Sequence, residues 1–277
     1  MSKIRPFVAF LIACSVGFSQ DQPEARKIVV RSVQAANDDA LLATQYTFQQ
    51  RDVTRSLDNS GKVKAVHTKL EEVLYIGSKQ YTRLLAKDDR QLSVEEERKE
   101  SDRIDKAVAE ANHLTPAQKV KREADLRHEI QQDEERRKYI PAAFDFKLLS
   151  TCVLNGREAY QIRATPKPDY HGKYALLLRN LQGTLYIDKH DYHWVKVEAE
   201  ALKDISLGLF LARISQGSVV IFEEARVNDE IWLPLRISAT ARARFLIKRV
   251  HQEEEVTFSN YRKFQTDSRV LSTTGTQ

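Results

Sequence analysis

The sequence predicts an α+β fold with one large, strongly curved, open antiparallel sheet that packs on helices. Three observations predict it: a helical pattern near the N-terminus, a long series of segments in which apolar and polar residues alternate, and the lack of strand–helix–strand alternation. The composition of 42% hydrophobic and 30% charged residues is that of an ordinary folded protein. A chain of 277 residues is long enough to form one such sheet domain.

The first residues have the pattern of a secretory signal peptide. Two basic residues precede an apolar run over residues 7–18, which is too short to span a bilayer as a helix. We therefore expect residues 1–19 to be a signal peptide, and the mature protein to be exported to the periplasm. A second possibility is a lipobox over residues 11–14, which would make Cys14 a lipidation site and anchor the protein in a membrane.

The mature chain is expected to begin with one amphipathic helix. Pro23 opens a stretch in which Ala25, Val29 and Val33 recur at helical spacing up to residue 38. From residue 43 the period changes to two, and a turn at 59–61 leads into a second extended segment, 63–76. Another strand is expected over residues 80–86.

A charged helical insertion interrupts the strands over residues 93–139. It contains 13 acidic and 11 basic residues and no glycine. Thr115 and Pro116 supply an N-cap and a first-turn proline for the second of two helices, each with only a narrow apolar stripe. We expect an antiparallel helical hairpin that packs weakly on the body or protrudes from it. Its charges form either a solvated face or an arm that docks a partner protein.

From residue 142 to residue 270 the pattern is again one of strands and turns. Asn155 and Gly156 predict one hairpin turn, and residues 188–193 predict another. In the following strand Val195, Val197, Ala199 and Ala201 alternate with polar residues, so one sheet face is dry and the other is wet. We expect about nine to eleven strands in a single domain over residues 20–277.

The longest alternation predicts the candidate binding residues. Seven apolar residues occupy every second position of one strand: Leu235, Ile237, Ala239, Ala241, Ala243, Phe245 and Ile247. The three alanines remove bulk from the sheet, which admits either a closely packed helix or an apolar ligand. The other face of this strand carries the basic residues Arg236, Arg242, Arg244 and Lys248. No nucleic-acid module accompanies them, so we expect no nucleic-acid partner, and a membrane surface fits them better.

Motifs for catalysis and for cofactors are missing from the sequence. It has no G-x-S-x-G elbow, phosphate loop, dinucleotide fingerprint or zinc-binding pattern. The acids and histidines of residues 188–193 are interpreted as a solvated turn rather than a metal site, and Cys152 as a buried, inert thiol. Glu198 and Glu200 share the wet face with Lys196, which argues against a glycosidase pair. We therefore expect no catalytic residue, no metal, no cofactor and no enzyme activity.

Motifs from Phe144 onward resemble those of a known family. They are Gly156 ahead of Tyr160 and Pro166, the segment 183–188, and Trp232-Leu233-Pro234 at the start of a long strand. In these features the chain resembles the bacterial outer-membrane lipoprotein-sorting proteins, the LolA-like superfamily, which includes LolB and RseB. The resemblance implies an open β half-barrel wrapped around helices, with an apolar cavity for the acyl chains of a lipoprotein in transit.

The residues and the resemblance together lead to two functional hypotheses. The first is a non-catalytic envelope protein of the lipoprotein-sorting kind, which binds a lipid or an acylated lipoprotein against the seven residues of the long strand. The alternative is an envelope sensor or scaffold that acts through the 93–139 arm. The family's carriers lack such an insertion.

Overall fold

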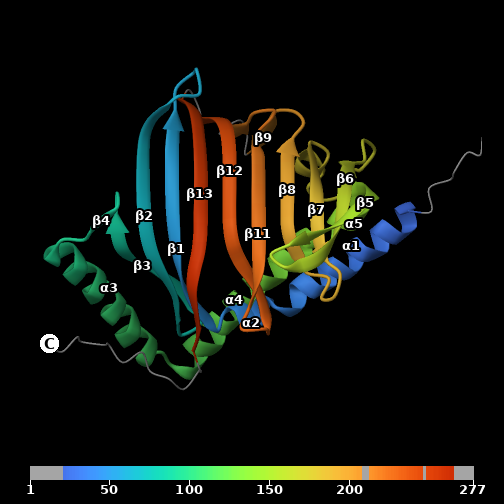
Figure 1. Cartoon of the computed structure of the whole chain (residues 1–277). Helices are drawn as coiled ribbons and strands as arrows, with labels where there is room; N and C mark the ends of the chain where they lie inside the picture. The colour runs from blue at the N-terminus through green and yellow to red at the C-terminus, as the bar shows by residue number, and fades with distance from the viewer. Residues whose placement is uncertain (1–20, 208–211, 246–247, 265–277) are drawn as a thin grey trace, which may run out of the picture.

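The computed structural model describes residues 21–207, 212–245 and 248–264 of the chain. In this part of the chain, thirteen strands form one antiparallel sheet (Figure 1). The first strands are β1 (Tyr46–Leu57), β2 (Val63–Ile76), β3 (Lys79–Lys87), β4 (Arg90–Gln91), β5 (Phe144–Leu154), β6 (Arg157–Pro166) and β7 (Leu181–Asp188). The others are β8 (Trp194–Ala201), β9 (Ile205–Leu207), β10 (Ala212–Ile214), β11 (Val219–Val227), β12 (Ile231–Phe245) and β13 (Lys248–Lys263).

Eleven of these strands lie in one continuous order, β4-β3-β2-β1-β13-β12-β11-β8-β7-β6-β5, and β10 joins β9 to β12. The sheet is therefore open, with β4 and β5 at its two edges. The strand β1, near the start of the chain, pairs with β13, near its end, so the N-terminal and C-terminal parts meet in the middle of the sheet. This architecture confirms the predicted fold class.

Six helices complete the described part of the chain. They are α1 (Asp21–Asp38), α2 (Ala40–Ala43), α3 (Val94–Asn112), α4 (Pro116–Arg137), α5 (Ile140–Ala143) and α6 (Ala175–Leu178). Figure 1 shows α1, α2 and α4 near one end of the long strands, while the opposite ends of β1, β2, β11, β12 and β13 extend away from them. No helix among the described residues combines the length and the apolar character that crossing a membrane requires.

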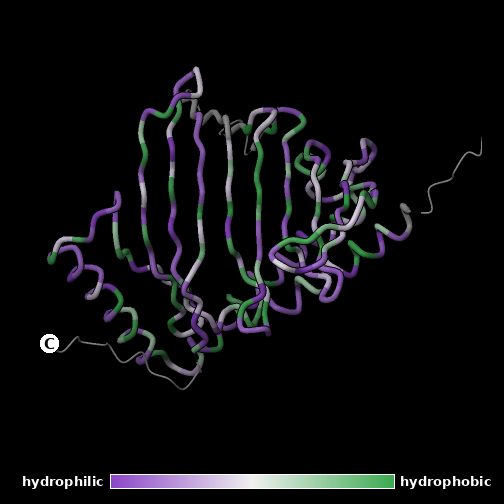
Figure 2. Tube along the Cα trace, viewed as in Figure 1, coloured by the Kyte–Doolittle hydropathy of each residue, from purple (hydrophilic) through white to green (hydrophobic). Residues whose placement is uncertain are grey.

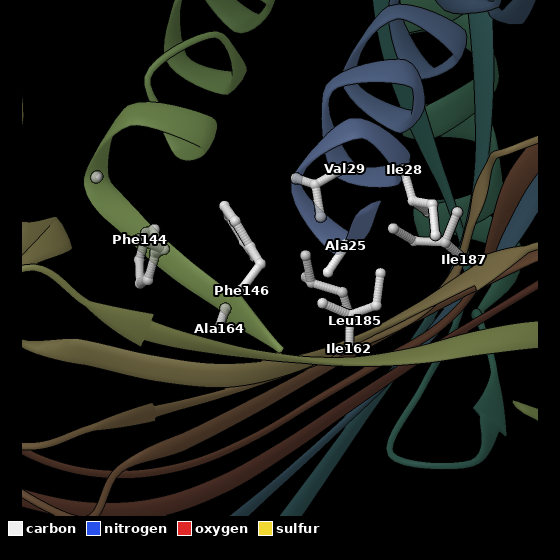
Figure 3. Close-up of a cluster of buried hydrophobic side chains, with 10 residues drawn as sticks. Ala25, Ile28, Val29, Phe144, Phe146, Ile162, Ala164, Leu185 and Ile187 are labelled. Carbon is white, nitrogen blue, oxygen red and sulfur yellow. The ribbon is translucent and has the colours of Figure 1, made fainter. Parts of the chain in front are cut away.

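The main core lies between α1 and the strands β5, β6 and β7. Ala25, Ile28 and Val29 of α1 pack against a group of buried side chains (Figure 3), which consists of Ala143, Phe144, Phe146, Ile162, Ala164, Leu185 and Ile187. The indole N–H of Trp194 donates a 2.7 Å hydrogen bond to the buried hydroxyl of Ser32. This bond fixes α1 to the start of β8. The helix predicted from Pro23 is confirmed, and it covers the β5 side of the sheet.

The insertion consists of the two predicted helices. Capping boxes at Ser93 and Thr115 satisfy the first amides of α3 and α4. Ile104 and Ala107 of α3 pack against the end of β2, whereas α4 has no buried residue. The two helices diverge from their connection (Figure 1) instead of lying along each other as the expected antiparallel hairpin would, and α4 runs toward α2.

Candidate functional site

One row of apolar side chains crosses seven strands on the same face of the sheet. Its members stand directly opposite one another in register and are Leu148, Ile162, Leu185, Val197, Phe222, Ile237 and Val256. We call this set the apolar row. Residues opposite each other on antiparallel strands share a face, so the row is one continuous apolar band from β5 to β13.

The helix α1 covers only part of the apolar row. Ile162 and Leu185, which lie beneath α1, are 0% and 6% exposed. Phe222, Ile237 and Val256 are half-buried, and they belong to none of the buried clusters found among the described residues. The row therefore continues beyond its helix onto β11, β12 and β13. Figure 2 shows hydrophobic and hydrophilic stretches mixed along β11 and β12, whereas β13 is mostly hydrophilic.

A second row on this face is made mainly of small residues. Ala164, Gly183, Ala199, Val220 and Ala239 stand opposite one another from β6 to β12. Only glycine fits at position 183, because the backbone of β8 lies very close to it. A Cβ atom there would lie 2.3 Å from the carbonyl oxygen of Glu198. Val220 is 46% exposed. These short side chains rise less far from the sheet than the apolar row beside them, and the apolar surface of β11 remains open to solvent.

Polar residues end the apolar face at β1. Val256 stands opposite Asp52, and Ala239 stands opposite Glu254. Next to Asp52, Lys69 follows on β2. The open surface is thus apolar on β11, on β12 and at Val256 of β13. The charged residues Glu254, Asp52 and Lys69 lie beside it. An amphiphile with an apolar chain and a polar head matches such a distribution.

Two of the predicted binding residues lie on this face, and Leu235 is the unpaired residue at a register shift between β11 and β12. Ile237 and Ala239 are half-buried members of the two rows, and Leu235 is 38% exposed. The backbone of Ala241, Ala243 and Phe245 continues β12 in regular register with β13. Ile247 lies outside the described residues. The packed helix considered as an alternative at Ala239 lies instead over β5–β7.

Sequence reasoning missed two members of the open surface, Phe222 and Val256. Phe222 lies in a strand whose alternation is broken by a register shift between Glu223 and Glu224. Val256 follows three consecutive glutamates, Glu253 to Glu255, in a strand that reads as polar. Only the pairing with β12 brings these two side chains beside Ile237.

The opposite face of the same strands carries alternating charges. Ion pairs join Lys196 to Glu223 at 3.9 Å, Glu223 to Arg236 at 3.6 Å, and Arg236 to Glu255 at 4.0 Å. Arg55 of β1 continues the series at 3.9 Å from Glu255. We call these five residues the charge ladder. It confirms the predicted wet face, and it neutralises Arg236, one of the basic residues proposed to contact a membrane.

The interpretation of residues 188–193 as a solvated turn is wrong for Asp188 and His193, which are buried, although His190 is exposed. Asp188 is 1% exposed and accepts two bonds from Arg157, at 2.6 and 3.0 Å. It also accepts the amides of His190 and Asp191, at 2.8 and 2.7 Å. Burial alone would raise the pKa of Asp188, but the bonds from Arg157 and the two amides outweigh burial and lower it. The carboxylate therefore fixes the hairpin inside the protein.

Neighbouring groups extend this ionic cluster. Asp191 accepts bonds from Arg157, from Arg226 at 2.9 Å and from the indole N–H of Trp232 at 3.1 Å. His193 stacks on Trp232, with ring centroids 5.7 Å apart. Burial lowers the pKa of His193 despite the nearby carboxylates. No group of three or more His, Cys, Asp or Glu residues in the described part of the chain is arranged to hold a metal.

Cys152, predicted to be a buried thiol, is half-buried. It packs beside Ala159 and Trp232, at the margin of a small apolar cluster.

Glu224 is a further buried carboxyl that sequence reasoning missed. Part of its side chain still reaches solvent, but other protein atoms surround the carboxyl group. This burial raises the pKa of Glu224 to about 8. Asp39 adds to this increase, and Arg137 at the end of α4 partly offsets it. Burial and the nearby Glu224 raise the pKa of Tyr261 as well. In the sequence Glu224 is indistinguishable from Glu223, which pairs with Arg236 on the charged face.

A hollow of about 460 Å³ lies away from the apolar face, between α4 and the segment before α6. Its lining consists of His128, Gln131, Gln132, Glu135, Arg136, Lys173 and Tyr174. Most of these side chains are exposed and polar, and Glu135 and Arg136 are engaged in ion pairs within α4 and its C-cap. Apart from the ring of Tyr174, the hollow is lined by polar or charged side chains, unlike the open apolar face.

Comparisons with known proteins find structures but no sequence relatives. No family model matches the chain, and no curated protein matches it by sequence. A putative outer membrane lipoprotein-sorting protein domain from Vibrio parahaemolyticus matches with a TM-score of 0.35 at 10% identity, over 87% of this chain and 95% of the other. A LolA superfamily protein from Nitrosomonas europaea matches with a TM-score of 0.31 at 11% identity, over 87% and 94%.

The complex of MucA and MucB from Pseudomonas aeruginosa contains a third similar chain. It has a TM-score of 0.24 at 12% identity, over 87% of this chain and 99% of the other. The resemblance expected from the sequence is thus found again in solved structures. At such identities and TM-scores it carries no argument about function.

Proposed function

We propose that this protein is an exported, non-catalytic binding protein that holds the acyl chain of a lipid or an acylated lipoprotein. The chain would lie on the open part of the apolar row, along Phe222, Ile237 and Val256. One observation carries the proposal: the row is continuous from β5 to β13, but α1 covers only the β5–β7 part of it.

The binding energy that such a site requires is modest. Transfer of a methylene from water to an apolar surface contributes about 0.8 kcal/mol, and micromolar affinity corresponds to about 8 kcal/mol. Roughly ten methylenes therefore suffice before the cost of ordering the chain is subtracted. Leu235 and Val220, at 38% and 46% exposed, offer additional apolar contact beside the row.

A titration of the mature protein with a single-chain fatty acid, followed by calorimetry, tests the proposal. Ile237→Glu places a charge in the middle of the open row and should weaken binding at least tenfold, since a bound chain would then have to desolvate a carboxylate. Thr240→Glu is the matched control, because Thr240 is exposed on the opposite face of the same strand. Equal affinity of folded Ile237→Glu and wild-type protein would remove the row from the binding site.

Export and anchoring are part of this proposal. Mass spectrometry of the protein recovered from a bacterial envelope separates the two forms. A chain that begins at Gln20 supports cleavage of residues 1–19, whereas a diacylated or triacylated Cys14 supports the lipobox. A chain that retains Met1 would contradict export.

A second candidate function belongs to the 93–139 arm, as an envelope sensor or scaffold. The 22-residue helix α4 has no buried residue, and Val120 is 67% exposed on it. Deletion of residues 93–139 distinguishes the candidates. A carrier retains fatty-acid binding without the arm, whereas a sensor loses the response of its signalling pathway while its apolar face is intact.

A further inference from the structure

The hollow between α4 and the segment before α6, which we call the polar hollow, has two walls. Five residues of α4 form one wall, and their spacing of three or four positions places them on one face of the helix: His128, Gln131, Gln132, Glu135 and Arg136. Lys173 and Tyr174 form the other wall. The volume of about 460 Å³ lies within the range of about 300–1,000 Å³ that is usual for small-molecule sites. A small ligand in the polar hollow would therefore contact both segments.

The ring of Tyr174 is oriented by its neighbours. Tyr174 has φ 60° and ψ 18°, in the left-handed region that a bulky residue rarely adopts. Its ring packs edge-to-face against Tyr139, with centroids 5.8 Å apart, and the Tyr139 hydroxyl donates a 2.7 Å hydrogen bond to Glu135. Tyr139 thus connects the two walls. Backbone strain of this kind is common where the position of a side chain serves binding.

The α4 wall offers hydrogen-bond donors and acceptors side by side. The amides of Gln131 and Gln132 each have both, as does a neutral imidazole. Gln132 is hydrogen-bonded to Nε2 of His128 at 2.8 Å, so these groups form one polar edge along the helix. Saccharide hydroxyls also donate and accept, and the C–H face of a pyranose ring can lie on an aromatic ring. One aromatic ring opposite a row of amides matches such a ligand.

The charge of the lining favours an acidic ligand. Two cations, Arg136 and Lys173, line the polar hollow with one carboxylate, Glu135. Arg136 and Glu135 pair with neighbours along α4, whereas Lys173 comes from the opposite wall. Its ammonium lies 5.3 Å from the centre of the Tyr174 ring. A ligand that lies on this ring would have a cation within reach, which suits a carboxylate.

We propose that the polar hollow binds an acidic saccharide. Its ring lies on Tyr174, its hydroxyls bond with the two glutamine amides, and its carboxylate pairs with Lys173. The proposal is independent of acyl-chain binding, because no residue of the polar hollow belongs to the apolar row.

NMR titration of the mature protein with D-glucuronate and D-glucose tests this proposal. The two sugars share the pyranose ring, and their terminal carbon is a carboxylate in glucuronate and a hydroxymethyl group in glucose. Glucuronate should shift the amide signals of residues 128–136 and 173–174, and should bind about fivefold more tightly than glucose, as one exposed ion pair allows. Equal affinities for the two sugars would overturn the proposal. Shifts confined to other residues, or no saturable shift, would overturn it as well.

Two pairs of variants test the named residues. Tyr174→Leu removes the ring and should weaken the binding of both sugars about tenfold, whereas Tyr174→Phe keeps the ring and should bind both as wild type does. Lys173→Gln should abolish the preference for glucuronate and leave glucose binding unchanged. Lys119→Gln removes the same charge at an exposed position near the start of α4, and it should change neither affinity.

The circular dichroism and the fatty-acid affinity of all four variants should equal those of wild type. If Lys173→Gln kept the preference for glucuronate, or if the two lysine variants lost it equally, the proposal would be overturned. Should Tyr174→Leu fail to fold, Lys173→Gln still decides, because Lys173 is exposed.

Discussion

At the scale of single residues, the protein places two carboxyl groups in opposite situations. Asp188 is buried and compensated by Arg157 and two amides, so its pKa is lowered. Glu224 is buried with little compensation, so its pKa is raised to about 8. The partners of Asp188 stabilise its charged form inside the protein. The burial of Glu224 favours a neutral carboxyl at neutral pH.

The raised pKa of Glu224 makes stability depend on pH. Between its ordinary value near 4.5 and about 8, the folded state keeps a proton that the unfolded state has released, so stability falls as pH rises through this window. Glu224→Gln should remove this dependence. Its free energy of unfolding should therefore rise relative to that of wild type by roughly 1 kcal/mol for each pH unit within this window. Urea unfolding of both proteins at pH 5, 6.5 and 8 measures it. A constant difference across the three pH values would contradict the assignment.

Removal of Arg157 should have a large effect on stability. Arg157→Met leaves the carboxylate of Asp188 buried without its main partner, which should cost about 3 kcal/mol of unfolding free energy at pH 7. The cost should shrink as pH falls below about 4, because protonated Asp188 no longer needs the guanidinium. Thermal and chemical unfolding at pH 7 and pH 3 measure both parts.

Lys189→Met is the control for this change. Lys189 pairs with the exposed Glu158 at 3.4 Å, so its removal should change stability by less than about 1 kcal/mol. If both variants lost the same free energy of unfolding, the ionic cluster around Asp188 would contribute no more to stability than a surface ion pair does.

These residues also show where prediction from sequence fails. The turn at 188–193 has the composition of a solvated turn, since Asp and His are common there. Its burial depends on Arg157 and Arg226, which arrive from other strands. The raised pKa of Glu224 likewise depends on burial in the folded protein and on the charges of Asp39 and Arg137, which come from distant segments. Local patterns carry no information about such partners.

At the scale of elements, most of the strands and helices follow from the sequence. Alternation predicts the long strands, and the caps at Thr115 and Asn155-Gly156 predict where elements begin and turn. Both Asn155 and Gly156 have positive φ, 51° and 77°, as a two-residue hairpin requires. The sequence did not predict which strands α1 covers, because apolar residues alternate on many strands and only the folded register assigns the helix to β5–β7.

The contribution of α1 can be measured by a pair of substitutions on one helix. Ile28→Ala empties a position that is 6% exposed and packs against the main core, which should cost about 2–3 kcal/mol. Val30→Ala changes a residue that is 40% exposed and should cost less than about 0.5 kcal/mol. Denaturant midpoints of the two variants test whether this face of α1 closes the core. Equal midpoints would contradict it.

At the scale of the whole molecule, one open sheet has two unlike faces. One face carries the apolar row, closed by α1 over β5–β7 and open over β11–β13. The other face carries the charge ladder. Such a division fits a protein that holds an apolar chain on one side of its sheet and keeps the other side in contact with water.

The position of a bound acyl chain is the central claim, and photo-crosslinking measures it directly. A fatty acid with a diazirine near the middle of its chain would be bound to the mature protein, irradiated, and the labelled peptides identified by mass spectrometry. Saturable labels should fall within residues 219–227, 231–240 and 252–258. Labels confined to the α3–α4 arm, or no saturable label in a folded protein, would contradict acyl-chain binding on the open apolar face.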